Sequence, residues 1–397
     1  MATAIPTANV AITELVPYGN NPRRGNVEAI KVSLRENGQY RPIVVRRSTR
    51  EVLAGNHTLE AARQLGWSEI AVTFVDCDEE QAKRIVLADN RTNDLAGYDD
   101  EALLELLLEL PSLDGTGYHQ EALDDLLDEV GADPLGDEEP VPSPPRKPKT
   151  RPGHLYALGP HHLLCGDARS AADYRRLLDD QQSAILWTDP PYGVEYEGKT
   201  AERLSIAGDG ADGLSELLQA SFAAVDSALR PGAPLYVCHP AGVLSLPFTQ
   251  AFVEQGWSLR QSLVWVKDSM VLGRSDHHYK HEAILYGFKP GKGRLGRGGR
   301  GWYGGNAEVS VFEVPRPTSS PDHPTMKPPE LIEAALRNSS RRREIVLDPF
   351  AGSGSTLVAA ERTGRVARLI ELDPRYCDVI VARWELLTGQ TAELVAG

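Results

Sequence analysis

The sequence predicts an α/β protein in which a doubly wound, mostly parallel sheet follows a small α+β domain. Three observations indicate this organisation. Strand-like runs alternate with helical stretches after residue 153, as in parallel sheets that are covered by helices. Shorter strand and helix signals alternate over residues 10–75. Residues 133–153 are rich in proline and change from acidic to basic, which predicts an extended linker between the two parts.

We therefore expect a first domain over residues 1–132, a linker over 133–153 and a second domain over 154–397. A chain of 397 residues is long enough for two or three domains, one of them with a complete α/β core. A long surface loop inside one domain is the alternative explanation of the proline-rich segment.

Charge is distributed unevenly along the chain. The net charge is −14, yet residues 76–139 alone hold 21 acidic and three basic residues, a net charge of −18. The rest of the chain therefore carries a net charge of +4. The acidic balance of the whole protein does not exclude a nucleic acid as its partner.

The composition argues against several classes of protein. No apolar run approaches the roughly 20 residues of a membrane span, and the first residues lack the basic and apolar segments of a signal peptide. The four cysteines are far apart and form no CxxC pair, which argues against a disulfide framework or a zinc site. We expect a cytoplasmic protein with no membrane partner and no metal.

In the first domain, residues 41–48 and 69–76 predict strands, while 26–38 and 57–67 have helical spacing and end at or beside a glycine. Residues 78–130 predict helices with leucines on one face and acids on the other. Such helices either pack on their own domain or offer a partner surface, in which case a homodimer is expected.

In the second domain, seven apolar runs predict the strands of the sheet. They are residues 162–168, 184–193, 233–240, 263–268, 281–289, 344–352 and 366–373. Sheets of this kind bind ligands at the carboxyl ends of their strands. Two unusual motifs lie at such ends.

The first motif is "VLDPFAGSGSTLVAA", residues 346–360. Residues 350–354 form a glycine turn, which lets the backbone approach a ligand, and the helix that follows offers free N–H donors. Glu371 ends the next strand 19 residues after Gly352, where an acid can accept hydrogen bonds from ribose hydroxyls. The GxxxxGK[ST] and GxGxxG patterns are absent, so we expect a nucleoside with a small polar arm. A purely structural turn is the alternative.

The second motif is "DPPY", residues 189–192. Asp189 follows a strand, and the two prolines have no N–H, so the turn presents acceptors beside the flat face of Tyr192. This arrangement suits a base with an exocyclic amino group, because acceptors that bind both amino protons direct the nitrogen lone pair at an electrophile. A base inside a duplex reaches such a pocket only when it is flipped out. A rigid proline turn without chemistry is the alternative.

These motifs resemble those of the amino-group DNA methyltransferases that use S-adenosylmethionine. "DPPYG" is similar to their catalytic motif, "DPFAGSG" to their cofactor loop, "HPTMKP" to the segment at the methionine end of the cofactor and "CGDA" to the strand end near the adenosine. The catalytic motif precedes the cofactor loop, as in the permuted β class. The resemblance covers most of residues 151–397 and implies a Rossmann-like class I methyltransferase fold.

The resemblance implies a set of functional residues. The catalytic residues are Asp189, Pro190, Pro191 and Tyr192. The residues expected at S-adenosylmethionine are Asp167, Thr325, Lys327, Asp348, Phe350, Gly352, Gly354, Ser355, Thr356, Glu371 and Asp373. Aspartate at the start of the catalytic motif is typical of adenine-directed members and favours adenine over cytosine as the target.

We expect a target-recognition region at about residues 268–322. Residues 289–305 hold five bases and no acid and include two aromatic residues, which suits contact with phosphates, guanine edges and the gap left by a flipped base. The expected DNA contacts are Lys199, Arg274, His278, Tyr279, Lys280, Arg294, Arg297, Arg300 and Trp302. A basic loop without sequence recognition is the alternative. Three histidines in residues 275–282 suggest a metal, but no Cys or Asp cluster supports one.

The first domain resembles the ParB-like N-terminal domain, of the ParB/sulfiredoxin-like fold, that precedes such methyltransferases in phage-type proteins. The motifs "NNPRR", "RPIVVRR" and "VLAGNHTLEAARQLGW" carry this resemblance over roughly residues 9–95. The candidate residues are Arg41, Gly55, Asn56, His57 and Thr58. In partition proteins the segment that matches residues 55–60 is rich in arginine and binds nucleotide phosphates. In this chain it holds no arginine, which favours a DNA-binding or assembly module over nucleotide binding or nuclease activity.

Together these observations predict a site-specific DNA methyltransferase, with double-stranded DNA as partner, that transfers a methyl group to the N6 amino group of adenine. N4-cytosine methylation is the first alternative. An RNA methyltransferase and a catalytically silent DNA-binding protein are the others. Some methyltransferases of this kind belong to restriction–modification systems, but the sequence does not identify a restriction partner.

Overall fold

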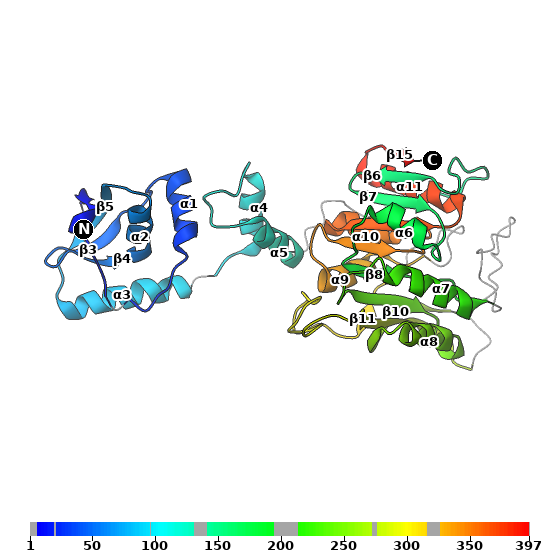
Figure 1. The fold of residues 1–397 in the computed structure, drawn as a ribbon. Helices are drawn as coiled ribbons and strands as arrows, with labels where there is room; N and C mark the ends of the chain where they lie inside the picture. Colours follow the sequence, from blue (N-terminus) through cyan, green and yellow to red (C-terminus); the bar gives the residue numbers. More distant parts are fainter. Residues whose placement is uncertain are drawn as a thin grey trace. The chain divides into compact units, whose positions relative to one another are not determined.

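The structure is a computed structural model that describes residues 6–19, 21–95, 97–130, 141–193, 213–271, 276–315 and 326–396. The chain divides into two compact units, unit 1 (Met1–Ala132) and unit 2 (Asp133–Gly397), both drawn in Figure 1. Each unit has its own apolar core, and each is described by itself.

Unit 1 contains a five-stranded sheet with the strand order β1-β5-β3-β4-β2. Its strands are β1 (Thr7–Ala11), β2 (Val16–Pro17), β3 (Ile43–Arg46), β4 (Glu51–Ala54) and β5 (Glu69–Val75), and a short 3-10 turn spans Ile12–Glu14. The helices α1 (Val27–Asn37) and α2 (Asn56–Gln64) contribute to the same core, in which Val45 and Val72 of the sheet pack with Leu59 of α2.

Three further helices complete unit 1: α3 (Glu79–Asp94), α4 (Asp100–Glu109) and α5 (Gln120–Val130). Ala82 and Val86 of α3 pack with Leu53 of β4. The leucines of α4 and α5 form a small core of their own. The helical spacing of residues 78–130 thus gives helices that bury some leucines, such as Leu104 and Leu107, and leave the acidic residues and other leucines, such as Leu106, exposed.

Unit 2 is built on a ten-stranded sheet with the order β12-β10-β11-β9-β8-β13-β14-β7-β6-β15. Its strands are β6 (Leu155–Leu158), β7 (His161–Cys165), β8 (Ile185–Thr188), β9 (Pro234–His239), β10 (Ser258–Val271), β11 (Tyr279–Phe288), β12 (Val311–Glu313), β13 (Ile345–Asp348), β14 (Val366–Glu371) and β15 (Glu393–Ala396). The central strands β9, β8, β13, β14 and β7 are parallel.

Helices cover both faces of this sheet (Figure 1). One face packs against α6 (Ala171–Leu178), α7 (Leu214–Asp226) and α8 (Leu246–Glu254), and the other against α9 (Pro329–Ser339), α10 (Ser355–Thr363) and α11 (Pro374–Thr388). A 3-10 turn, η2 (Gly242–Ser245), precedes α8. Because side chains alternate along a strand, Leu186 of β8 packs in one core and Trp187 in the other. Burial on both faces explains why these strands are continuous apolar runs.

The predicted fold class is confirmed, with one difference: the sheet is mixed. β11 pairs antiparallel with both β9 and β10, and β6 pairs antiparallel with β7 and β15. The sequence signals of β1, β4, β6 and β15 were too short to predict these strands. Among the described residues, no helix combines the length and the apolar character needed to cross a membrane.

Strand direction defines two edges of the sheet in unit 2. The parallel strands β7, β8, β9, β13 and β14 all end at one edge, here named the carboxyl edge, and begin at the amino edge. β11 runs in the opposite direction. It therefore begins with Tyr279 at the carboxyl edge and ends with Phe288 at the amino edge, opposite Pro234. The direction of each strand therefore decides whether the side chains at its start or those at its end lie at the carboxyl edge.

Replacing Leu347 of β13 by alanine should lower the free energy of unfolding of unit 2 by about 2–5 kcal/mol, because its side chain is 0% exposed and a cavity would remain. Leu394→Ala is the matched control, since Leu394 of β15 is 52% exposed. Its effect should stay within about 0.5 kcal/mol. Urea unfolding followed by tryptophan fluorescence measures both; equal losses would contradict the assignment of the core.

Candidate active site

The turn after β8 presents the "DPPY" motif at the carboxyl edge. Every residue of β8 is buried, so Asp189 emerges where the strand leaves the core. The Tyr192 ring packs edge-to-face on Phe248 of α8, with ring centroids 5.9 Å apart. Its hydroxyl donates to Oδ1 of Asp189 at 2.8 Å. The turn thus fixes a carboxylate beside an aromatic ring.

Asp189 belongs to a group of five residues that we name the charged cluster: Asp189, Tyr192, Lys267, Glu282 and Lys327. Nζ of Lys327 lies 2.6 Å from Oδ2 of Asp189 and 2.9 Å from Oε2 of Glu282. Lys267 of β10 binds the other oxygen of Glu282, Oε1, at 2.5 Å. The two lysine side chains are only 7% and 5% exposed. Two positive and two negative charges offset each other, as burial requires.

Burial and charge pull the pKa values of this cluster in opposite directions. Burial raises the pKa of Asp189, although Lys327 opposes the shift. Burial also acts against ionisation of Glu282, but Lys327 and Lys267 outweigh it and lower the pKa of Glu282 to about 2. Burial would lower the pKa of Lys327, yet the two carboxylates raise it well above its usual range. The two carboxylates therefore favour the charged form of Lys327.

The glycine turn follows β13 at the same edge. Asp348, at the end of β13, is buried and accepts hydrogen bonds from the backbone N–H of Phe350 at 3.0 Å and the hydroxyl of Thr356 at 2.5 Å. It ties the two ends of the turn together. Burial raises the pKa of Asp348 to about 7.

The glycine turn leads directly into α10, and the first residues of this helix offer polar groups to a ligand. Gly352 and Gly354 have φ angles of +54° and +86°, which favour glycine. α10 begins at Ser355, whose buried hydroxyl has no hydrogen-bond partner among the described residues. These groups suit a ligand that approaches the backbone closely.

Glu371, at the end of β14, faces this turn. Its two oxygens accept hydrogen bonds from the backbone N–H groups of Gly352 and Asp373, both at 2.8 Å. Each carboxylate oxygen has a second lone pair, which leaves one for a ligand hydroxyl. Burial raises the pKa of Glu371 to about 7.

Two further predicted residues flank Glu371. The carbonyl of Glu371 accepts from Gly166, which places Asp167 next to it; Asp167 pairs with Arg169 at 2.7 Å. Asp373 caps α11 and pairs with Arg375. The structure thus gathers most of the expected cofactor residues at one stretch of the carboxyl edge: Asp167, Asp348, Phe350, Gly352, Gly354, Ser355, Thr356, Glu371 and Asp373.

Other predicted residues lie elsewhere. Nζ of Lys327 contacts the carboxylate of Asp189, although we expected Lys327 at the cofactor. Thr325, Lys199 and Arg274 lie outside the described residues. The roles of all these residues stay predictions.

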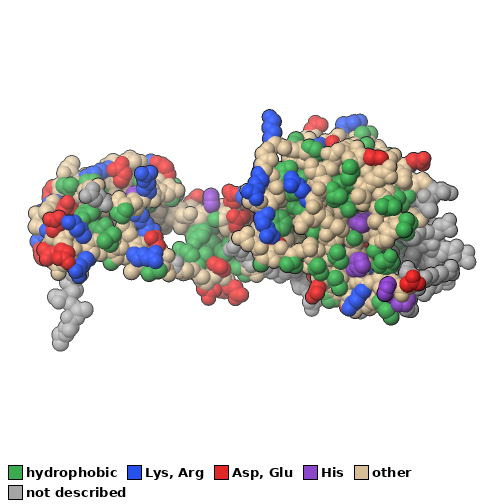
Figure 2. Space-filling model, turned by 90° about the horizontal axis from the view of Figure 1, so that it is seen from below, with side chains coloured by type: hydrophobic (Ala, Val, Ile, Leu, Met, Phe, Trp, Pro, Cys, Tyr) green, Lys and Arg blue, Asp and Glu red, His purple; other side chains and the backbone are tan. Residues whose placement is uncertain are grey.

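The predicted DNA contacts separate into two groups. His278, Tyr279 and Lys280 are exposed at the carboxyl edge, beside the start of β11. Residues 289–305 follow the end of β11 and lie at the amino edge, where Leu295 approaches Gly232 before β9. The six residues of β9 put roughly 20 Å between the two edges. In Figure 2, Lys and Arg side chains gather toward one end of unit 2 and His side chains toward the other.

Trp302, which we expected to fill the gap of a flipped base, lies in the loop at the amino edge, and its role stays a prediction. Its ring packs edge-to-face on Tyr286, with centroids 6.5 Å apart, and the Arg297 guanidinium lies over it at 5.4 Å. Like Arg294 and Arg300, it belongs to the loop at the amino edge. The antiparallel direction of β11 carries this loop away from Asp189.

Sequence reasoning missed three residues of the site. Lys267 and Glu282 hold the charged cluster, and Arg383 of α11 donates to the carbonyl of Ser353 at 3.1 Å within the glycine turn. No local signal marked the first two, because β10 also holds Arg260 and Asp268, and β11 also holds Lys280.

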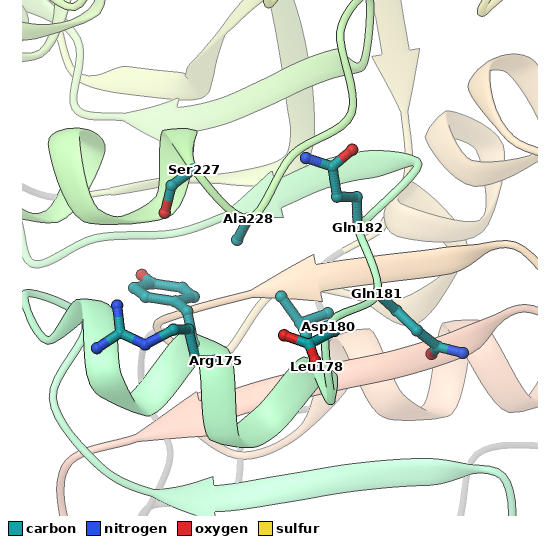
Figure 3. A pocket seen from close by; sticks show the side chains of 8 residues that line it. Arg175, Leu178, Asp180, Gln181, Gln182, Ser227 and Ala228 are labelled. Carbon is teal, nitrogen blue, oxygen red and sulfur yellow. The ribbon is translucent and has the colours of Figure 1, made fainter.

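A hollow of about 290 Å³ lies at the amino edge, near the start of β8 (Figure 3). It is lined by Tyr174, Arg175, Leu178, Asp180, Gln181, Gln182, Ser227 and Ala228. The labelled polar side chains do not converge on one point. Nothing there resembles the convergent polar groups of the carboxyl edge.

The candidate residues of unit 1 also come together. Arg41, Gly55, Asn56, His57 and Thr58 line a cavity of about 420 Å³. Two of them already have structural partners. Nε2 of His57 accepts from the backbone of Gly25 at 2.9 Å, and Oδ1 of Asn56 accepts from Tyr18 at 2.9 Å.

Residues 184–382 match the family described as DNA methylase, whose name, N6_N4_Mtase, covers both N6 and N4 amino groups. The chain belongs to this family. Residues 3–91 match the ParB N-terminal domain. Both resemblances are confirmed, and the role of the ParB-like unit as a DNA-binding or assembly module stays a prediction. DNA methylases of this family use S-adenosylmethionine.

Among curated relatives, the type II methyltransferase M.XycI of Xanthomonas campestris pv. cyanopsidis is 29% identical over 42% of this chain and 57% of its own length. The chain thus spans little more than half of that relative. DNA adenine methyltransferase YhdJ of Escherichia coli K12 is 25% identical over 53% of this chain and 79% of its own length. A putative DNA modification methylase of Thermus thermophilus, solved with S-adenosyl-L-methionine, is 25% identical over 58% of this chain and 96% of its own, with a TM-score of 0.41.

In the described residues of this DNA methylase, no group of three His, Cys, Asp or Glu side chains is placed to hold a metal ion. The charges at the carboxyl edge form lysine–carboxylate pairs.

The raised pKa of Asp348 predicts a pH dependence of stability. Its pKa is about 7 in the folded protein against an ordinary 3.8, so the folded state binds more protons between these values. Stability should therefore fall as pH rises from about 4 to 7, by up to about 1.4 kcal/mol per pH unit for this group.

Asp348→Asn should reduce the change of stability with pH, because the amide of asparagine does not titrate. Urea unfolding at several pH values measures it. Asp276→Asn, at an exposed site, is the control and should leave the slope unchanged. A slope that is the same in all three proteins would contradict the assignment.

Proposed function

We propose that this protein transfers a methyl group from S-adenosylmethionine to the N6 amino group of adenine in double-stranded DNA, after the base has been flipped out. The observation that carries the proposal is the placement of Asp189 and Tyr192 beside the glycine turn. β8 and β13 are paired neighbours, so the two motifs follow adjacent strand ends. Family membership supports an amino group as acceptor, and the aspartate of "DPPY" favours adenine.

The chain's own residues fit the cofactor. Glu371 has free lone pairs for ribose hydroxyls, the start of α10 offers backbone donors, and the Ser355 hydroxyl lacks a partner among the described residues. We assign these groups, with Gly352 and Gly354, to holding it. Bound S-adenosylmethionine supplies a methyl group on a positively charged sulfonium.

The residues of the "DPPY" turn act on the target base. Tyr192 offers its ring for stacking, and the Asp189 carboxylate and the Pro190 carbonyl accept the amino protons. These acceptors stabilise the positive charge that develops on the nitrogen during transfer more than they stabilise the neutral amine. Lys327 keeps Asp189 oriented and favours its ionised form. No covalent bond between enzyme and DNA is needed.

The test is to incubate the protein with unmethylated plasmid DNA and isotope-labelled S-adenosylmethionine and to analyse the nucleosides by mass spectrometry. Label on deoxyadenosine is expected. Label on deoxycytidine would keep the chemistry and overturn the base assignment. Label on RNA alone, in a parallel reaction, would overturn the DNA substrate.

Asp189→Ala should lower the rate of transfer by roughly 10²–10³-fold, as loss of a transition-state hydrogen bond does in other enzymes. Binding of S-adenosylhomocysteine, measured by calorimetry, should be unchanged because Asp189 lies in the neighbouring turn. Glu105→Ala, on the exposed face of α4, is the control. Full transfer by the Asp189 variant would contradict its catalytic role.

Gly354→Ala should weaken S-adenosylhomocysteine binding by about tenfold, or about 1.4 kcal/mol. Its φ of +86° is unfavourable for alanine, and the new Cβ would lie 3.1 Å from Ile380, so the turn must shift. Gly389→Ala is the matched control: its φ is +68°, it ends α11, and its Cβ would meet nothing within 4 Å. That variant should lose stability and keep its affinity. Equal affinities in both variants would contradict the role of the turn.

A further inference from the structure

Glu282 has a position in the charged cluster that the proposed mechanism does not use. Its carboxylate is 20% exposed and comes from β11, two strands away from β8. Lys267 holds Oε1, and Lys327 holds Oε2 at 2.9 Å. Oε2 also lies 3.1 Å from the Tyr192 hydroxyl. Glu282 is thus fixed by two cations and faces the catalytic turn.

Lys327 is fully engaged in this arrangement. An ammonium group has three N–H donors, and Nζ has three acceptors in reach: Oδ2 of Asp189, Oε2 of Glu282 and, at 3.1 Å, the Tyr192 hydroxyl. One oxygen of Asp189 is therefore committed to Lys327. The other, Oδ1, accepts from the Tyr192 hydroxyl at 2.8 Å.

The target amino group must compete for Oδ1. A carboxylate oxygen that serves two donors divides its charge between them, so the bond to the amine strengthens when the phenol leaves. The phenol has one proton and two carboxylate acceptors, Oδ1 of Asp189 at 2.8 Å and Oε2 of Glu282 at 3.1 Å. Rotation about its C–O bond moves the proton from one to the other while the ring stays in place.

We propose that Glu282 is a positioning residue that accepts the Tyr192 hydroxyl when the target amino group arrives, and so releases Oδ1 of Asp189 for the amine. Lys267 keeps Glu282 in place for this exchange. The inference rests on the proposed function, because it assigns Asp189 to the amino group. It adds a residue from β11 that acts only through Tyr192.

The test is a double-mutant cycle between Glu282 and the Tyr192 hydroxyl. Lys267→Met/Glu282→Met removes one charge of each sign and leaves the Asp189–Lys327 pair intact. Tyr192→Phe removes the hydroxyl and keeps the ring. Single-turnover methylation of DNA is measured for the wild type, each variant and the combination. Calorimetry measures the affinity for S-adenosylhomocysteine, and fluorescence anisotropy that for DNA.

In the wild-type background the Lys267/Glu282 change should slow transfer by about tenfold, the effect of losing a hydrogen bond of ordinary strength. The affinities for S-adenosylhomocysteine and DNA should stay the same. In the Tyr192→Phe background the further loss should be less than about twofold, because no hydroxyl competes for Oδ1. Glu282→Gln, tested in both backgrounds, replaces the double variant if that variant does not fold.

Equal losses in both backgrounds would overturn the inference and show that Glu282 acts only by holding Lys327. An unchanged rate in the wild-type background would also overturn it. Both results leave the proposed function intact, since the wild type methylates DNA in the same assay. A wild type that methylates no nucleic acid would overturn the proposed function and this inference together.

Discussion

The buried ammonium of Lys327 is the charge on which the carboxyl edge depends. Lys327 precedes α9, Asp189 follows β8 and Glu282 belongs to β11, so one side chain connects three elements that are far apart in the sequence. Without it, two carboxylates would face each other in a poorly solvated site, and burial already raises the pKa of Asp189. Removing one partner of a buried pair is costly because the remaining charge is uncompensated. The positions of the Asp189 and Glu282 carboxylates and the stability of the fold therefore depend on the same lysine.

The mixed sheet makes this cluster possible. A parallel strand delivers its last residue to the carboxyl edge, while an antiparallel strand delivers its first residues there. Asp189 thus comes from the end of β8 and Glu282 from near the start of β11, with β9 between them. The antiparallel pairing of β11 also explains why its flanking residues are far apart: those before it lie at the carboxyl edge, and those after it lie at the amino edge.

The sequence was sufficient where the chemistry is local. "DPPY" is contiguous, the glycine turn lies within a few residues, and Glu371 follows Gly352 at a spacing that two adjacent parallel strands impose. It was insufficient for contacts between distant residues. Lys327 and Asp189 are 138 positions apart, and no local pattern shows that they pair. Lys267 and Glu282 lie in strands that hold other charged residues, such as Asp268 and Lys280, so the sequence does not single them out.

The basic loop shows that charge composition alone does not say at which edge of the sheet a segment lies. Residues 289–305 have the composition of a DNA-binding segment, but whether they reach the flipped base depends on the edge at which β11 ends. The six residues of β9 separate the two edges by roughly 20 Å, so the loop lies well away from the edge that holds Asp189. At the carboxyl edge, His278, Tyr279 and Lys280 are exposed beside the start of β11, and their contact with DNA stays a prediction.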